Sequence, residues 1–284
     1  MTDSPICPPN MIFPNFDQFT ELAQRGNFVP VYQELVADLE TPVSAWYKVC
    51  AGQPYSFLLE SVEGEEKLGR YSFLGCDPMW VLEARGETTT QTHRDGSIET
   101  FKGNPFEICN QCLESIKPVK LPELPPGIGG LFGVWGYELI RWIEPRVPVQ
   151  ELQPEDLPDG VWMQVDNVII FDQVKRKIWA ISYADLRDDR QTIEQAYQLA
   201  GDRVTKLILK LQLPLPIEAK VLAWNPHQAN SSEDGGIVYC SNTDKDLFCA
   251  NVNKVKEYIH AGDIFQAVLS QKLSTVYKGH PFNL

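Results

Sequence analysis

Three side chains that could bind a small zwitterion lie close together in FLLESVEGEEKLGRYSFLG, residues 57–75. Two apolar strands flank an acidic loop; the first ends in Glu60 and Ser61, and the second begins with Arg70. A hairpin would bring them to one edge, where Glu60 or the Ser61 hydroxyl could meet an ammonium group and Arg70 a carboxylate. The same pattern also fits a surface ion pair that closes the hairpin.

A second candidate is Gln266, in the segment GDIFQAVLSQKLS that follows a predicted helix. The helix pattern starts at a capping residue, Thr243, and stops at Gly262. Its apolar positions recur at helical spacing: Phe248, Val252, Val255 and Ile259. The alternation that follows predicts a strand over 264–273 with Gln266 on its polar side. Gln266 therefore faces either a pocket or solvent.

Other segments carry only superficial signs of chemistry. The run GGLFGVWGYE lacks the spacing and the Lys-Ser/Thr of a phosphate loop, so its glycines indicate close backbone approach or positive φ. Cys109 and Cys112 form a single CxxC inside a helical pattern, which favours a buried face over a redox or metal site. The acidic run 185–189 is interpreted as a helix entrance, where carboxylates favour the positive end of the helix dipole.

The elements that position these residues are mostly strands in the first two thirds of the chain. Turn signals about every ten residues predict an α+β fold, a largely antiparallel sheet with packed helices. The predicted strands cover 29–36, 44–50, 56–61, 70–75, 80–85, 88–93, 130–137, 166–172 and 177–185. Helices are predicted over 105–116 and 188–211. The predicted organisation is a leader at 1–24, a domain at 25–212, a linker at 213–240 and the start of an incomplete domain at 241–284.

Composition narrows the possible partners. The 284 residues carry a net charge of -13, which argues against nucleic acid or an anionic membrane as the main partner. No stretch approaches the ~20 apolar residues of a membrane span, so a cytoplasmic location is expected. The seven cysteines are scattered and only four histidines are present, so no metal site built from this chain alone is expected.

Four motifs in order, FLLES, GRYSFLG, GGLFGVWGYELIRWIE and GDIFQAVLSQ, resemble component I of anthranilate synthase, in the chorismate-utilising enzyme family. The resemblance covers about residues 25–284. It implies the N-terminal part of a layered β-α-β sandwich, with a tryptophan feedback site followed by a chorismate-binding domain. By this resemblance Ser61 contacts tryptophan, with Glu60 beside it and Arg70 in a basic pocket. Gln266 replaces the lysine base of the water-using isochorismate synthases, which is typical of the ammonia-using members.

The resemblance also implies a reaction and its participants. A glutamine amidotransferase subunit supplies ammonia, which displaces the chorismate C4 hydroxyl with the assistance of Mg²⁺; pyruvate is then eliminated and anthranilate forms. Family chains are nearly twice as long, and the residues that hold magnesium and act on chorismate have no counterpart here. We therefore expect a partial enzyme that is inactive alone and aggregation-prone or disordered after about residue 240. The alternatives are aminodeoxychorismate synthase component I and a non-catalytic tryptophan-binding or assembly module.

Overall fold

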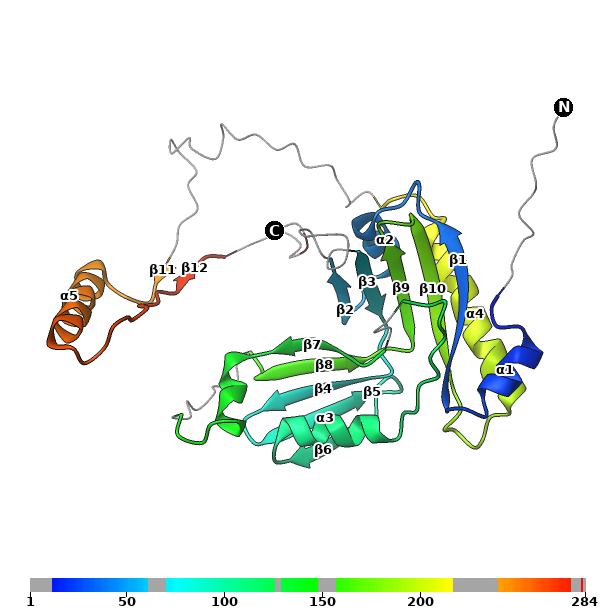
Figure 1. Ribbon diagram of the computed structural model, residues 1–284, viewed down its shortest axis with the longest axis horizontal. Helices are drawn as coiled ribbons and strands as arrows, with labels where there is room; N and C mark the ends of the chain where they lie inside the picture. Colours follow the sequence, from blue (N-terminus) through cyan, green and yellow to red (C-terminus); the bar gives the residue numbers. More distant parts are fainter. Residues whose placement is uncertain are drawn as a thin grey trace. The chain divides into compact units, whose positions relative to one another are not determined.

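The computed structural model describes residues 12–60, 70–125, 129–147, 157–216, 240–276 and 282. The chain divides into two compact units, Met1–Lys220 and Val221–Leu284, and each is described by itself (Figure 1). Ser61 and most of the predicted linker lie outside the described residues.

The first unit contains two five-stranded sheets in which every strand pair is antiparallel (Figure 1). The strand order of the first sheet is β1-β10-β9-β3-β2. Its strands are β1 (Phe28–Val36), β2 (Ser56–Leu59), β3 (Tyr71–Cys76), β9 (Asn167–Asp172) and β10 (Lys177–Asp185). In this sheet the first strand of the unit, β1, pairs with its last strand, β10: Phe28 pairs with Asp185 and Val36 pairs with Lys177.

The second sheet is built from the chain between β3 and β9, in the order β6-β5-β4-β8-β7. Its strands are β4 (Trp80–Arg85), β5 (Thr88–His93), β6 (Ile98–Lys102), β7 (Leu131–Trp135) and β8 (Gly160–Gln164). A 3₁₀ helix, η1 (Tyr137–Trp142), follows β7. The predicted α+β class with largely antiparallel sheets is confirmed.

The helices bury apolar faces against these sheets. They are α1 (Phe16–Leu22), α2 (Pro42–Val49), α3 (Pro105–Glu114) and α4 (Ile193–Leu211). Val204 and Ile208 of α4 pack on Ala180 of β10, and Ala200 joins Phe19 of α1 in a neighbouring cluster. On the second sheet, Ile108 of α3 packs in one cluster with buried tryptophans of β4 and β8.

Two predictions about local structure were wrong. Residues 44–50, predicted as a strand, belong to α2, because Thr41 and Ser44 form a capping box and Pro42 occupies the first turn. The helix predicted over 188–211 begins later, at Ile193, since Thr192 caps it, and the acidic run 185–189 lies just before it. Part of the predicted leader is α1, whose Phe19 side chain is fully buried.

The second unit contains β11 (Cys240–Ser241), α5 (Lys245–Ala261) and β12 (Leu273–Ser274), with β11 paired to β12. Asp244, not Thr243, caps α5. The predicted stop at Gly262 is confirmed by its left-handed φ of 81°. The predicted strand over 264–273 was wrong: within residues 264–276 only Leu273–Ser274 is paired.

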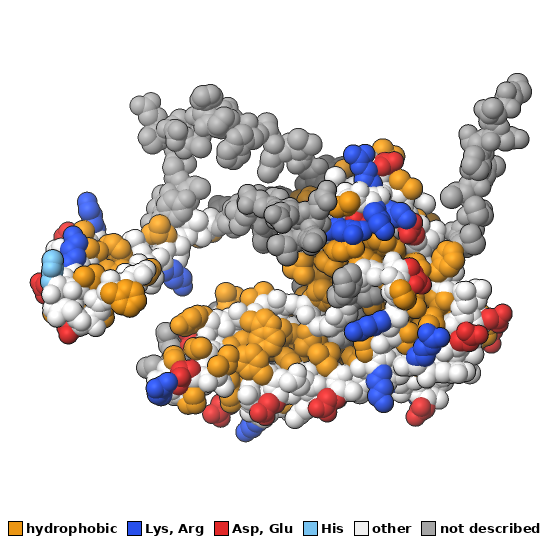
Figure 2. Space-filling view, viewed as in Figure 1, with side chains coloured by type: hydrophobic (Ala, Val, Ile, Leu, Met, Phe, Trp, Pro, Cys, Tyr) orange, Lys and Arg blue, Asp and Glu red, His pale blue; other side chains and the backbone are white. Residues whose placement is uncertain are grey.

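Hydrophobic side chains gather over β7, β8 and β4 on the face shown in Figure 2. Val134 and Trp135 of β7 are 69% and 49% exposed. The two side chains point to opposite faces of the sheet, and Trp135 stacks on Phe106, so Val134 is the apolar side chain left for another polypeptide to cover.

Candidate functional site

The β2–β3 hairpin places two of the three predicted zwitterion-binding residues at the same end of the sheet. Leu59 pairs with Phe73, Glu60 follows β2, and Arg70 immediately precedes β3. Glu60 is exposed, and Arg70 is partly exposed. The hairpin therefore supplies a carboxylate and a guanidinium at one edge, and Ser61 belongs to the loop between them.

Arg70 is held by a residue that the sequence analysis missed, Asp172. Nε of Arg70 donates to both carboxylate oxygens at 3.0 and 3.1 Å, and Nη2 donates to Oδ2 at 2.6 Å. Oδ1 of Asp172 also accepts the backbone N–H groups of Val174 and Lys175. Burial alone would raise the pKa of Asp172, but the hydrogen bonds from Arg70 and the backbone outweigh it and hold this pKa below its ordinary value.

This ion pair fixes the orientation of the guanidinium. The Asp172 side chain is fully buried, whereas that of Arg70 is 29% exposed. Within the described ranges Nη1 of Arg70 makes no hydrogen bond, so its protons can meet an incoming carboxylate. Arg70 does form an ion pair, but its partner is the buried Asp172 of β9, so this pair is not the surface pair within the hairpin that the sequence suggested.

An aromatic contact links this hairpin to the second sheet. The rings of Phe57 in β2 and Phe132 in β7 stack with centroids 4.0 Å apart and planes 9° apart. Gly75 makes room for this stack, because a Cβ there would lie 2.7 Å from the Phe57 ring. The close approach predicted for the glycine-rich run also occurs: a Cβ on Gly133 would lie 1.9 Å from the Val161 oxygen.

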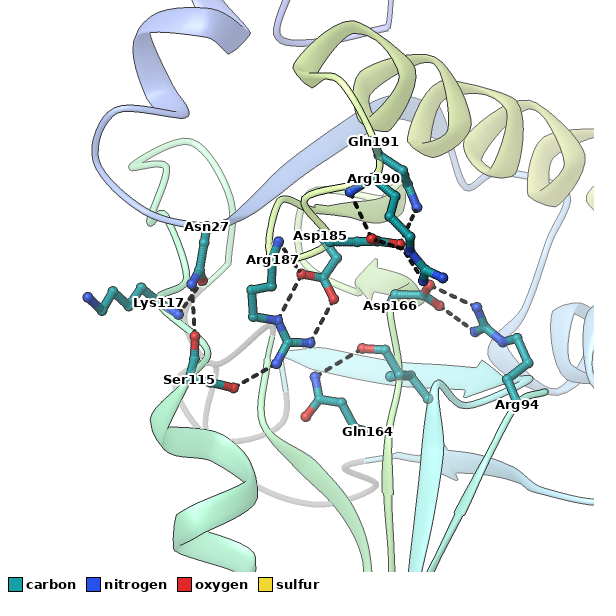
Figure 3. Close-up of polar contacts among 12 residues, drawn as sticks. Asn27, Arg94, Ser115, Lys117, Gln164, Asp166, Asp185, Arg187, Arg190 and Gln191 are labelled. Carbon is teal, nitrogen blue, oxygen red and sulfur yellow. Dashed lines mark hydrogen bonds and ion pairs between the residues drawn. The ribbon is translucent and has the colours of Figure 1, made fainter. Parts of the chain in front are cut away.

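The chain passes from the second sheet to the first at Asp166, which anchors a polar cluster (Figure 3). Its carboxylate is 2% exposed and accepts Nη2 of Arg94 at 2.7 Å and Nη1 of Arg94 at 3.1 Å. Nη1 of Arg203 on α4 lies 2.9 Å from the same carboxylate. Because these groups come from both sheets and from α4, the cluster fixes how the sheets meet.

The carboxylates of the acidic run are engaged locally. Asp185 pairs with Arg187, which also donates to Ser115 (Figure 3). Asp188 pairs with Arg190. The hydrogen bonds of Arg190 are the main cause that lowers the pKa of Asp188 to about 2. These ion pairs hold the segment that precedes α4, and they occupy carboxylate lone pairs that a metal ion would need.

The CxxC pair lies on α3, as predicted, with Cys109 buried in the core of the second sheet. Burial, followed by the neighbouring Cys112, raises the pKa of Cys109 to about 12, so its thiol stays protonated near neutral pH. Across the part of the chain that the structure describes, no group of three or more His, Cys, Asp or Glu side chains could hold a metal ion.

Gln266 lies between α5 and β12 in irregular backbone and is exposed. It belongs to the second unit, whereas Glu60 and Arg70 belong to the first. Its role at a pocket stays a prediction. None of the helices in the described ranges has the length and apolar content needed to traverse a bilayer.

Comparison with known proteins identifies the family to which this chain is similar. The family model described as chorismate binding enzyme matches residues 55–284. Over 274 residues the chain is 67% identical to a protein of Synechocystis sp. named anthranilate synthase component 1, covering 96% of this chain and 54% of that relative. A protein of the same name from Acetivibrio thermocellus is 37% identical over 279 residues, with coverages of 96% and 54%.

A solved structure shows the same fold. The crystal structure of anthranilate synthase component I from Streptococcus pneumoniae TIGR4 matches with a TM-score of 0.56 and 22% identity. The match covers 88% of this chain and 50% of that one. The chain thus spans about half the length of the curated relatives it matches.

Proposed function

The chain belongs to the chorismate binding enzyme family, and we propose that it is the N-terminal part of an anthranilate synthase component I. The observation that carries the proposal is the 67% identity to the Synechocystis relative over 96% of this chain. In this proposal the complete enzyme converts chorismate and ammonia to anthranilate and pyruvate in the cytoplasm. A glutamine amidotransferase subunit supplies the ammonia.

We assign this chain the regulatory part of that enzyme. Tryptophan would bind at the β2–β3 hairpin, with its ammonium near Glu60 and the Ser61 hydroxyl and its carboxylate near Arg70. Nη1 of Arg70, which makes no hydrogen bond to the described part of the chain, and the fixed direction of the guanidinium support this assignment. Asp172 is then a positioning residue, because it holds Arg70 without contacting the ligand.

Gln266 is proposed to face the chorismate site once the catalytic domain is complete. An amide has no basic nitrogen, so it does not activate water as a lysine would, and ammonia is already a nucleophile. Magnesium, when bound, would neutralise carboxylate charge and orient chorismate. The described residues do not fit a magnesium site, so we attribute its ligands to the half of the relatives that this chain does not span.

An exposed apolar side chain of β7 supports the same division. Val134 is 69% exposed here, and in the proposed enzyme the remaining half would cover it. We therefore propose that the polypeptide spanned by this chain requires that half for turnover.

The test is reconstitution. This chain is purified alone and also co-expressed with a polypeptide that corresponds to the unmatched part of the Synechocystis relative. Both samples receive chorismate, ammonium and Mg²⁺, and the product is identified by chromatography and fluorescence. Anthranilate from the co-expressed pair alone is the expected result. Turnover by the isolated chain would contradict the need for a second half, and aminodeoxychorismate as product would assign the alternative enzyme.

A further inference from the structure

A cavity of about 300 Å³ lies over the helix-facing side of the first sheet, where the cover by helices is incomplete. α4 covers β10 and β1, and α2 packs against β3. Between these helices the floor is formed by Leu74 of β3 and Ile169 of β9, which are paired partners and therefore point to the same face. Both are buried, so the cavity has an apolar floor.

The walls of this cavity carry four cationic side chains and one carboxylate, that of Asp77. Arg203, Lys206 and Lys210 lie at helical spacing on α4, and Arg94 approaches from the turn after β5. Such a concentration of cations is unusual in a chain with a net charge of -13. We call this feature the basic cavity.

Two of the four cations have carboxylate partners. Arg94 and Arg203 share Asp166, at 2.7 and 2.9 Å, and Arg94 also lies 3.3 Å from Asp77. Their charges are therefore largely compensated within the protein.

The two lysines are not compensated in this way. Nζ of Lys210 donates to the Val49 carbonyl at 3.1 Å, which occupies one of its three protons. Nζ of Lys206 has no hydrogen bond or ion pair among the residues that the structure describes. Two ammonium groups one turn apart on α4 thus carry charge that no carboxylate of the described chain neutralises.

We propose that the basic cavity binds a small organic carboxylate, with its carboxylate on Lys206 and Lys210 and its apolar part over Leu74 and Ile169. Ammonium groups form charge-assisted hydrogen bonds with carboxylate oxygens, and an apolar floor favours a ligand with an apolar body. The site lies at the Cys76 end of β3, and Arg70 lies just before the other end of this 6-residue strand, about 20 Å from Cys76 along the chain. It goes beyond the proposed function, because it is separate from the hairpin assigned to tryptophan.

Calorimetric titration of the full chain with benzoate tests this proposal, and benzamide serves as the neutral analogue of the same shape. Benzoate is expected to bind and benzamide is not. Lys206→Ala is expected to weaken benzoate binding about tenfold, since one charge-assisted hydrogen bond is lost. Lys206→Arg keeps the charge and is expected to retain most of the affinity.

The matched control is Lys256→Ala, which removes an exposed lysine from α5 in the second unit. This variant is expected to bind benzoate as the unmodified chain does, and circular dichroism verifies that all variants are folded. Absence of benzoate binding, equal binding of benzamide, or equal loss in the Lys206→Ala and Lys256→Ala variants would overturn the proposal. None of these results depends on anthranilate formation, so the basic cavity and the proposed function fail or succeed separately.

Discussion

Nζ of Lys210 on α4 donates a hydrogen bond of 3.1 Å to the carbonyl oxygen of Val49, the last residue of α2. The relationship is reciprocal, because Nζ of Lys48 on α2 donates to the carbonyl of Leu211, the last residue of α4, at 2.9 Å. Each lysine thus donates to a carbonyl at the end of the other helix, and that carbonyl accepts no hydrogen bond within the helix to which it belongs. Each helix therefore caps the C-terminal end of the other.

Loss of this reciprocal capping is expected to destabilise the first unit. Lys48→Met and Lys210→Met should each lower the free energy of unfolding by about 1 kcal/mol, because each removes a hydrogen bond to a helix-end carbonyl, and Lys48→Met also removes an ion pair with Glu40. Urea unfolding measures the effect. The control is Lys177→Met, which removes only an exposed ion pair with Glu34. This variant should lower the free energy of unfolding by a smaller amount. Equal losses in all three variants would contradict a specific role for the helix ends.

Asp166→Asn is expected to lower the free energy of unfolding by about 3 kcal/mol, since it leaves Arg94 and Arg203 without their shared buried carboxylate. The comparison is Asp188→Asn, because Asp188 pairs with Arg190 at an exposed loop. That variant should unfold at nearly the same urea concentration as the unmodified protein. A mild effect at Asp166 would show that the polar cluster does not fix the junction of the sheets.

The Arg70–Asp172 pair gives a prediction about pH. The pKa of Asp172 is lowered in the folded protein, so its stabilising contribution is present above the unfolded pKa of about 4 and is lost as the pH falls through the folded value. Arg70→Gln should therefore unfold more easily than the unmodified protein at pH 6, and the difference should shrink as the pH falls well below 4. Denaturant midpoints measured across this range test the sign. A difference that grows in acid would refute the assignment.

Gly133→Ala is expected to destabilise the fold by about 3 kcal/mol or more, because its Cβ would lie 1.9 Å from the Val161 backbone oxygen. Gly52→Ala is the control. Gly52 has open space around it and a φ of 80°, so that substitution carries only the left-handed backbone cost of about 1 kcal/mol. Gly133 does not have a positive φ, so a larger loss of thermal stability in Gly133→Ala than in Gly52→Ala identifies the steric clash, and equal losses would contradict it.

Ser61→Arg tests the assigned tryptophan site. In the complete enzyme this substitution should abolish feedback inhibition, because a bulky cation replaces the hydroxyl proposed to meet the tryptophan ammonium. Inhibition curves for tryptophan measure the change, with Lys256→Ala as a control outside the hairpin. Unchanged inhibition would remove Ser61 from the site.

Much of the first unit follows from local patterns in the sequence. The β9–β10 hairpin was predicted over 166–172 and 177–185, and it occurs at Asn167–Asp172 and Lys177–Asp185, because alternation and a short polar loop define it locally. The stop of α5 at Gly262 was equally predictable. The strand expected over 264–273 was not formed, since alternation does not create a strand without a partner for its edge.

The candidate site was only half predictable. Glu60 and Arg70 flank one loop, so a hairpin pattern brings them together. Asp172 lies 102 residues from Arg70 in the chain, and no local periodicity links the two. The lysines of the basic cavity were missed for a related reason: they fit an ordinary polar stripe on α4, and only the tertiary arrangement of α2 and β9 makes that stripe the wall of a cavity.

The insertion of the whole second sheet between β3 and β9 has a consequence for folding. β1 cannot pair with β10 until late in synthesis. Phe28 pairs with Asp185, and Asp185 follows all five strands of the other sheet in the chain. Such a high contact order predicts slow folding, with an unpaired β1 edge during most of translation. The inserted sheet, in contrast, is contiguous in sequence and can form first, which brings the ends of β3 and β9 together and shortens the loop that the outer sheet must close.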